Sequence, residues 1–456
     1  MRDLLRQVRT TTRHSLRPRH SACRHSTTGR VVWLFGLVAL AATGSCNSLT
    51  SVDAPDVIQS SDANSPAGAN ALRVGAVASF YTWLGSNSIP TASTENMVNY
   101  AGLLADELVS GVDPSANTSI IDARRLSDPG LTASQYILLH RARVAALKAI
   151  AALQQYAPTP AARIGELFAL VGLSRVWFAE FFCSGVPLST NAQSAPVYGP
   201  SLTTQQLLES ALPIFDSALA YGQDSSRITA LAWVGKGRAL LDLGRFAEAA
   251  STVGPVADAY TTGTEHSATV QPNGIAAAFA QRRYGVADLE GGTGLNFVTA
   301  NDPRIPTALA GKGSDNVTDI YGDSRITTTT PIPLASGVEA RLIEAEAALQ
   351  AGDLAGWLNA LNRSRSIQGL PPLSDPGSAS ARVDLLFRER AFSLFLTGHR
   401  LGDLRRLVRQ YGRQESAVFP AGIFKDGAPR GSDVNFPIPT SENNNPNFKG
   451  CINRDP

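Results

Sequence analysis

The chain has 456 residues, of which 43% are hydrophobic, and carries 40 Lys and Arg against 38 Asp and Glu. This composition is enough for a folded core and argues against intrinsic disorder. Eight arginines but only one acidic residue lie within the first 45 residues, which leaves 32 basic and 37 acidic residues in the rest. The body of the chain is therefore acidic, which argues against a nucleic-acid-binding protein.

An apolar run of twelve residues, Val31–Ala42, follows the arginine-rich start. It is shorter than the roughly 20 residues that a membrane-spanning helix needs, and its order is that of a secretory signal peptide. The sequence TGSC (43–46) then places small residues before a cysteine, as in a lipoprotein signal. We predict a signal peptide over 1–45 and a lipid-modified Cys46 at the start of the mature protein. The alternative is an ordinary signal peptide followed by a chance cysteine.

After Cys46 the chain is expected to form a tether and lead-in (46–70) and then one domain (71–456). Apolar residues recur at helical spacing through most of this domain. In Ala133–Tyr156, for example, we place Tyr136, His140, Val144, Leu147 and Ala151 on one apolar face. The predicted helices are Ala71–Leu84, Thr94–Val109, Ala133–Tyr156, Ala161–Phe182, Thr203–Tyr221, Ile228–Val253 with a break at Gly244, Val338–Ala351, Gly356–Ile367, Ala381–Thr397 and Leu401–Tyr411.

Two regions lack this periodicity. Residues 254–336 are rich in Gly, Thr, Asn, Pro and Asp, so we expect loops, short helices and a possible hairpin. We call this region the insert. The last 45 or so residues are also irregular and contain five prolines. The sequence therefore predicts a mostly α-helical fold with one loop-rich region.

The segments Ala239–Ala250 and Ala347–Leu361 resemble each other, because each ends an apolar helix at a glycine and starts another helix. Gly244 aligns with Gly352, and a glycine at this position can adopt the left-handed conformation that ends a helix. This pattern is typical of tetratricopeptide-like helical hairpins.

Three titratable residues invite a catalytic interpretation. His140 lies on an apolar helix face, so we interpret it as a packed histidine rather than a ligand. His399 has no serine or cysteine nucleophile pattern beside it, which favours a structural His/Arg corner. Glu389, with Arg388, Arg390 and Arg400 nearby, indicates an ion-pair network rather than an acid/base pair. We predict no catalytic or metal site and no cofactor.

Three motifs occur in order over about 339–447: RLIEAEAALQAGD with ALNRSRSIQGLPPL, LFRERAFSLFLTGHRLGDLRR, and FPIPTSENNNPN. In order and spacing they resemble the C-terminal signature of SusD/RagB-like lipoproteins. AEFFCSGVPLS (179–189) and NDPRIP (301–306) also fit. Leu401 and Gly402 depart from the family, which often has aromatic residues after the His-Arg pair, and KGCINRDP replaces the usual C-terminal ending.

The resemblance implies a mostly helical protein with tetratricopeptide-like hairpins and an irregular ligand-facing region. It implies a lipid-anchored position on the outer membrane, facing the cell exterior. The partner would be a SusC-like TonB-dependent transporter, on which this chain acts as a lid that binds oligosaccharides, peptides or similar nutrients without performing chemistry.

Two other classes of function remain open. A tetratricopeptide scaffold lipoprotein would show regular repeats, which the insert and the tail fit poorly. A helical glycoside hydrolase would need two carboxylates across a cleft, and Glu290 and Asp302 are the candidates in the insert.

Cys183 and Cys451 remain after Cys46 is acylated, and an exported protein meets an oxidising environment. We expect them to form a disulfide that ties the tail to the helical body, with two separate buried thiols as the alternative.

The resemblance also suggests ligand-binding residues, because corresponding regions of the family often contribute to the ligand face. Trp83 closes the first helix before a polar loop that contains Asn87, and Tyr284 and Tyr321 lie in the insert. We predict these four as ligand-binding residues, with ordinary packed or surface side chains as the alternative.

Overall fold

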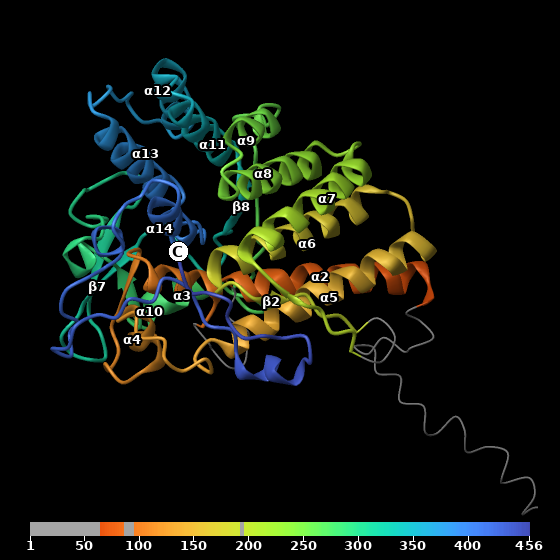
Figure 1. The fold of residues 1–456 in the computed structure, drawn as a ribbon, viewed down its shortest axis with the longest axis horizontal. Helices are drawn as coiled ribbons and strands as arrows, with labels where there is room; N and C mark the ends of the chain where they lie inside the picture. The colour runs from red at the N-terminus through yellow and green to blue at the C-terminus, as the bar shows by residue number, and fades with distance from the viewer. Residues whose placement is uncertain (1–63, 86–94, 192–195) are drawn as a thin grey trace, which may run out of the picture. The chain divides into compact units, whose positions relative to one another are not determined.

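The computed structural model describes residues 64–85, 95–191 and 196–456, all within one unit that spans Gln59–Pro456. This unit is mostly α-helical (Figure 1). Its α-helices are α2 (Pro66–Gly85), α3 (Met97–Leu104), α4 (Asn117–Asp122), α5 (Ala133–Tyr156), α6 (Ala162–Phe181), α7 (Thr204–Gly222), α8 (Ser226–Asp242), α9 (Phe246–Val253), α10 (Gly274–Ala280), α11 (Gly337–Gln350), α12 (Leu354–Ile367), α13 (Ala379–Ser393), α14 (Arg400–Arg409) and α15 (Glu415–Val418). Short 3-10 helices lie at Glu290–Gly292 and Thr440–Asn444.

The predicted helices agree with the observed ones within a few residues, with two exceptions. The helix α2 begins inside the predicted tether, because Ser65 accepts a hydrogen bond from the Gly68 backbone N–H (3.0 Å) and Pro66 occupies the first turn. Ser65 and Pro66 therefore start a helix here, since serine is a favoured N-cap residue and proline is favoured in the first turn. The predicted helix Thr94–Val109 is also wrong at its end: α3 stops at Leu104, and strand β1 (Leu108–Ser110) follows.

The two helical hairpins are confirmed. The turn between α8 and α9 contains Gly244 at φ +72°, and the turn between α11 and α12 contains Gly352 at φ +75°. Both conformations are left-handed, which favours glycine. The helices α9 and α11 contact each other, so the two hairpins are adjacent.

Long helices pack closely through small side chains. The helices α2 and α5 run side by side in Figure 1 and contact each other, and α6 contacts α2, α5, α7 and α8. The buried face of α5 contains Leu139, Ala142, Ala146 and Ile150. The face that we predicted for this helix is confirmed only in part: Tyr136 is buried and Leu147 packs against the core, but Ala151 is exposed.

The strands form four separate two-stranded antiparallel sheets among the described residues. The strand β1 pairs with β5, so Ser110 lies opposite Tyr284, and the short β2–β3 pair connects α6 to α7. The insert contains a β6–β7 hairpin, in which Leu309 lies opposite Tyr321, and β4 pairs with β8. Loops, a short helix and a hairpin in this region were predicted. The strands are β1 (Leu108–Ser110), β2 (Val186–Pro187), β3 (Ser201–Leu202), β4 (Thr261–Gly263), β5 (Tyr284–Val286), β6 (Thr307–Lys312), β7 (Asp319–Asp323) and β8 (Pro333–Ser336).

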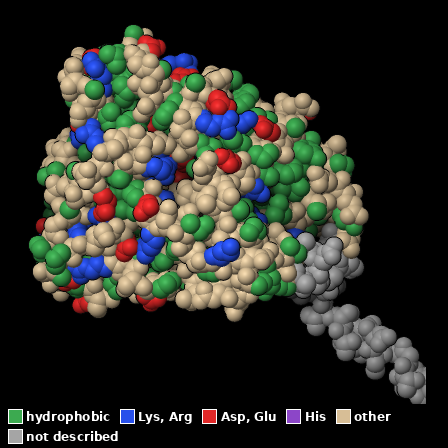
Figure 2. Space-filling view, in the orientation of Figure 1, with side chains coloured by type: hydrophobic (Ala, Val, Ile, Leu, Met, Phe, Trp, Pro, Cys, Tyr) green, Lys and Arg blue, Asp and Glu red, His purple; other side chains and the backbone are tan. Residues whose placement is uncertain are grey.

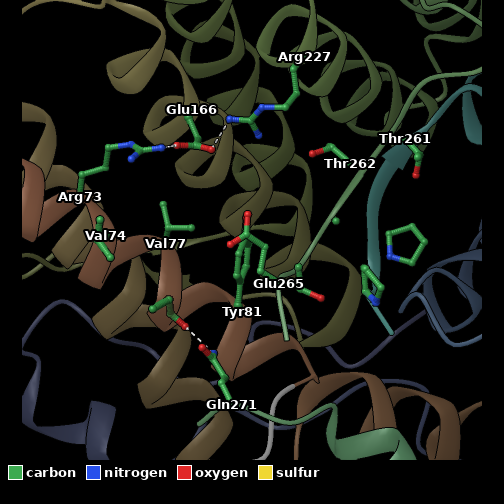
Figure 3. Close-up of a pocket in the computed structure, with 15 residues that line it drawn as sticks. Arg73, Val74, Val77, Tyr81, Glu166, Arg227, Thr261, Thr262, Glu265 and Gln271 are labelled. Carbon is green, nitrogen blue, oxygen red and sulfur yellow. Dashed lines mark hydrogen bonds and ion pairs between the residues drawn. The ribbon is translucent and has the colours of Figure 1, made fainter. Parts of the chain in front are cut away.

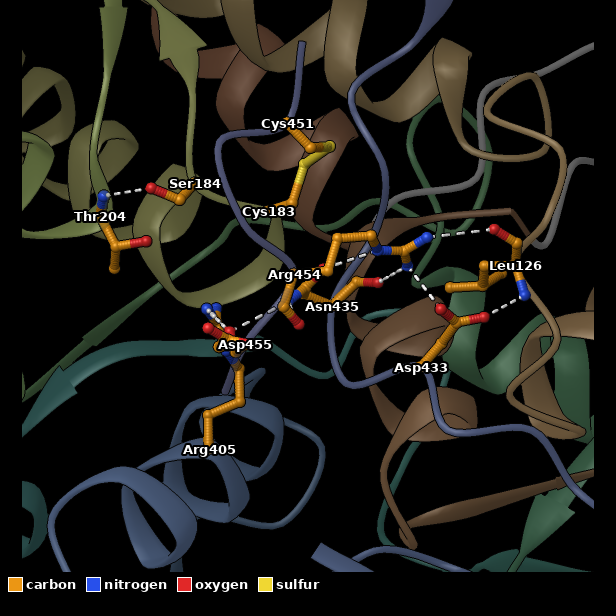
Figure 4. Close-up of a disulfide and its surroundings, with 10 residues drawn as sticks. All are labelled: Leu126, Cys183, Ser184, Thr204, Arg405, Asp433, Asn435, Cys451, Arg454 and Asp455. Carbon is orange, nitrogen blue, oxygen red and sulfur yellow. Dashed lines mark hydrogen bonds and ion pairs between the residues drawn. A yellow bond between two sulfur atoms is a disulfide. The ribbon is translucent and has the colours of Figure 1, made fainter.

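A disulfide joins Cys183, just after α6, to Cys451 in the C-terminal tail (Figure 4), with the two Cα atoms 5.8 Å apart. The same tail pairs through the Ser184–Asn453 bridge, and Arg454 forms an ion pair with Asp433 at 2.8 Å. The disulfide therefore joins the irregular tail to the helical body. This pairing was expected, because two cysteines remain once Cys46 is acylated.

Charged side chains of both signs are scattered over the face seen in Figure 2, without one large patch of either sign. In the part of the chain that the structure describes, no helix has the length and apolar character needed to cross a membrane.

Candidate functional site

A cavity of about 950 Å³ lies between helices α2, α6 and α8 on one side and the insert on the other (Figure 3). We call it the α2 cleft. Residues of α2 form one wall, and the segments 261–271 and 331–333 form the opposite wall. Its volume is at the upper end of the roughly 300–1,000 Å³ that is typical of ligand pockets.

An ion-paired triad connects three helices at this cleft. Glu166 of α6 is only 7% exposed and accepts hydrogen bonds from Arg73 of α2 and from Arg227 of α8, the latter at 2.7 Å. In Figure 3 the two guanidinium groups approach this carboxylate from opposite sides. The Arg227 side chain is 50% exposed, and a guanidinium has five N–H donors, so donors remain for a ligand.

Two uncharged side chains add hydrogen-bonding groups. Burial, together with the carboxylates of Glu166 and Glu265, raises the pKa of Tyr81 to about 12. Its hydroxyl therefore stays protonated at neutral pH. Gln271 donates its Nε2 hydrogens to Thr82 Oγ1 (2.8 Å) and to the Ala78 carbonyl (3.3 Å), which fixes the amide plane against α2. Its carbonyl oxygen is an acceptor at the cleft.

The insert wall is held by reciprocal hydrogen bonds. Thr264 donates its backbone N–H to the Ile332 carbonyl (2.9 Å), and the Ile332 N–H donates to Thr264 Oγ1 (2.8 Å). Ile332 is buried, whereas the flanking Pro331 and Pro333 are exposed. We call Pro331–Ile332–Pro333 the proline ridge.

The ridge is seated on the end of α2. A Cβ at Gly85 would lie 1.8 Å from the Ile332 Cδ1 atom, so a larger residue at this position would force the isoleucine side chain to move. Because a proline ring fixes the backbone φ angle, the ridge presents a rigid apolar edge.

The lining of the α2 cleft combines polar and apolar groups. Guanidinium, carboxyl, hydroxyl and amide groups alternate with apolar surface from Val74, Val77 and the prolines. The charged residues of the lining are Arg73, Arg227 and the carboxylates Glu166 and Glu265.

Two of the four predicted ligand-binding residues lie in the core instead. Trp83 is 1% exposed, donates Nε1–H to the Gln135 carbonyl (2.9 Å), and packs against Trp177 with ring centroids 4.9 Å apart. Tyr284 is fully buried in β5. Neither ring presents a face on which a ligand could stack, which contradicts our prediction for both.

The other two predictions have different outcomes. Tyr321 is half-buried on the β6–β7 hairpin and is not among the residues that line the α2 cleft. Asn87 lies outside the described residues, as does the predicted lipidation site Cys46.

The carboxylate pair considered for a glycoside hydrolase is engaged by arginines. Glu290 is paired with Arg430, and Asp302 is paired with Arg304 at 2.7 Å. Burial alone would raise the pKa of Asp302, but hydrogen bonds from Arg304 outweigh it and lower the pKa. A general acid needs a raised pKa, so the lowered pKa of Asp302 does not fit this role.

The C-terminal motif forms a buried ion-pair network, as predicted, although with other partners. Glu389 binds Arg304 and Arg365, each at 2.8 Å, rather than the adjacent arginines in sequence. Arg304 belongs to the NDPRIP motif of the insert, so this network ties the insert to α13.

His399 also has a structural environment. Its Nε2 lies 3.0 Å from Glu339 Oε1, and Arg238 binds the same carboxylate at 2.7 Å. Burial opposes the charge on Glu339, but Arg238 and His399 outweigh it and lower its pKa to about 2. Burial lowers the pKa of His399. Within residues 64–85, 95–191 and 196–456, no group of three or more His, Cys, Asp or Glu side chains forms a metal site.

His140 packs between aromatic rings, with centroid distances of 4.6 Å to Tyr136 and 4.3 Å to Phe178. Burial lowers its pKa well below the usual value. The packed interpretation is confirmed.

Sequence reasoning missed the residues of the cleft itself. Arg73, Glu166 and Arg227 are separated by 93 and 61 positions, and a single sequence carries no signal that pairs them. Tyr81 was weakly indicated, because it is an aromatic residue in the first helix, two positions before Trp83. It lines the α2 cleft on the side that faces the insert.

Neither a protein-family model nor a curated protein matches this sequence. Solved structures do match the fold. A SusD-like carbohydrate-binding protein from Bacteroides vulgatus has a TM-score of 0.61 at 13% identity, over 84% of this chain and 97% of that one. A SusD superfamily protein from Bacteroides fragilis has a TM-score of 0.62 at 14% identity, over 84% and 99%.

A laminarin-binding SusD-like protein is also similar, with a TM-score of 0.54 at 14% identity, over 85% of this chain and 98% of that protein. These similarities cover nearly the full length of the solved proteins and agree with the resemblance in the C-terminal motifs. The chain has the SusD fold.

Proposed function

We propose that this protein binds a glycan in the α2 cleft and captures it for uptake. The observation that carries the proposal is the cleft itself, in which hydrogen-bonding side chains from α2, α6 and α8 face apolar edges of the insert. A sugar ring needs this combination, because its hydroxyl groups require donors and acceptors while its C–H faces favour apolar contact.

The similar structures support the same class of ligand. Two of them are described as carbohydrate-binding proteins, one of them as laminarin-binding. Peptides remain the alternative ligand that the family resemblance allows, because the Arg73–Glu166–Arg227 triad could also bind a peptide's charged ends.

The resemblance in the C-terminal motifs extends the proposal to cellular context. We propose that Cys46 is lipidated, that the protein sits on the outer membrane facing the cell exterior, and that it acts as the lid of a SusC-like TonB-dependent transporter. Energy for uptake would come through the transporter, so this chain would need no catalytic centre of its own.

A glycan array followed by isothermal titration calorimetry tests ligand binding. Gln271→Ala should weaken binding of the best glycan by roughly three- to tenfold, as expected when one or two hydrogen bonds are lost. The matched control is Gln205→Ala on α7, an exposed glutamine outside the cleft, which should bind as wild type. Saturable binding that neither variant changes would place the ligand elsewhere, and no binding to any glycan would refute the proposal.

Co-purification from native outer membranes tests the lid role. The full-length protein should co-isolate with a TonB-dependent transporter, and deletion of its gene should impair growth on one polymeric nutrient without changing the nutrient's enzymatic breakdown. Isolation without a transporter, together with consumption of a glycan by the purified protein, would favour a hydrolase instead.

A further inference from the structure

A second, smaller cavity lies across the proline ridge from the α2 cleft. Its volume is about 240 Å³, and Pro331 and Pro333 line it as well as the α2 cleft. We call it the ridge pocket. The remaining lining comes from the insert, from the end of α12 and from the end of α13.

The ridge pocket is too small for an independent ligand of ordinary size, because ligand pockets typically occupy roughly 300–1,000 Å³. It is large enough to accept one end of a ligand whose greater part lies in the α2 cleft. The two cavities share the prolines, so such a ligand would cross the ridge.

Three polar side chains at the ridge pocket, Arg325, Gln368 and Ser393, can bind a hydroxylated ligand. Arg325 is paired with the buried Asp323, yet its side chain is 50% exposed. Ser393 Oγ accepts hydrogen bonds from Arg304 Nη1 (2.9 Å) and from Gln368 Nε2 (3.0 Å). Because its oxygen accepts twice, the hydroxyl hydrogen of Ser393 is its remaining donor.

The ridge between the cavities is rigid enough to orient a chain. Its middle residue, Ile332, is buried and hydrogen-bonded in both directions to Thr264, and only its two prolines are exposed. A ligand that crosses here meets apolar proline rings in the middle and polar groups on either side.

We infer that the ligand of the α2 cleft is a linear oligosaccharide, whose chain crosses the proline ridge and places a terminal unit in the ridge pocket. This inference rests on the proposed glycan binding and adds a minimum chain length to it. A mono- or disaccharide would fill only the α2 cleft.

Calorimetric titration with oligosaccharides of increasing length tests the inference. The probes are laminaribiose through laminarihexaose, and in parallel the size-fractionated partial hydrolysate of the polysaccharide that binds best on the array. Affinity should rise in a step once the chain is long enough to cross the ridge. Arg325→Gln and Gln368→Ala should each lower the affinity of the long oligomers by about three- to tenfold and leave that of the shortest binding oligomer unchanged.

The shortest oligomer is the internal control for folding, since a misfolded variant would lose affinity for every length. Arg363→Gln is the matched control for loss of charge, because this arginine on α12 is 52% exposed, pairs with Asp258 at 2.8 Å and lines neither cavity. Affinity that does not change with length, or equal losses for short and long oligomers, would overturn the inference and leave glycan binding intact. Failure of every glycan to bind would overturn both.

Discussion

Substitutions at positions 81 and 83 separate the ligand-binding face of α2 from its core face. Trp83 is 1% exposed and its indole packs against Trp177 and Phe181, with centroid distances of 4.9 Å and 6.1 Å. Replacing a buried aromatic residue by alanine typically costs about 3–5 kcal/mol, so Trp83→Ala should lower the free energy of unfolding by this amount. Trp83→Phe keeps a ring but loses the hydrogen bond to the Gln135 carbonyl, and should cost about 1–2 kcal/mol.

Tyr81→Phe should have the opposite pattern. Tyr81 lines the cleft and phenylalanine keeps its ring, so the loss of the hydroxyl should change the free energy of unfolding by no more than about 1 kcal/mol. Glycan affinity should fall by roughly three- to tenfold, the cost of one hydrogen bond.

Urea denaturation followed by far-ultraviolet circular dichroism measures the stability of each variant, and calorimetric titration measures its glycan affinity. Trp83→Phe should lose stability while keeping its affinity. The reasoning would be refuted by a Trp83→Phe protein of wild-type stability that no longer binds glycan, or by a Tyr81→Phe protein that is destabilised but binds normally.

Three further predictions follow from other parts of the molecule. Replacing Cys183 and Cys451 by serine together should lower the free energy of unfolding by roughly 2–4 kcal/mol; mass spectrometry of non-reduced peptides should find the two cysteines linked in the wild type, and two alkylatable thiols there would contradict the bridge. Burial raises the pKa of Glu107 to about 8, partly offset by the hydrogen bond from the Leu396 N–H. Since this folded pKa lies above the unfolded value, the wild type should lose stability as the pH rises from about 4.5 to 8. Relative to the wild type, Glu107→Gln should therefore be more stabilising at pH 8 than at pH 5. An equal effect at both pH values would contradict a raised pKa of Glu107. Cys46→Ser should release the protein from the detergent phase or block its processing, whereas a wild-type protein that is itself soluble with an unmodified mature N-terminus would refute lipidation.

Periodicity alone predicted most helices because their apolar spacing is local. The hairpin turns at Gly244 and Gly352 were also predictable, since the left-handed conformation favours a particular residue type. The start of α2 was missed because its N-terminal serine and proline stand within a polar stretch that has the composition of a linker. The end of α3 was missed because β1 depends on pairing with β5, more than 170 positions later.

The candidate site was less predictable because it also depends on contacts between residues that are far apart in the sequence. The sequence favours aromatic residues as ligand contacts, but two of these, Trp83 and Tyr284, are buried, because aromatic rings contribute more to the core than almost any other side chain. The cleft is instead built from charged and polar groups of three helices, brought together with the insert by long-range packing. The sequence resemblance indicated only that the first helix and the insert contribute to the ligand face, and the α2 cleft is lined by residues of both.

The most direct test of the account is a crystal structure of the protein with the glycan that binds best on the array. We expect electron density for the sugar in the α2 cleft, within hydrogen-bonding distance of Tyr81, Gln271 or Arg227, with the chain directed toward the proline ridge. Sugar bound at another surface, with the α2 cleft empty at saturating ligand, would contradict the account.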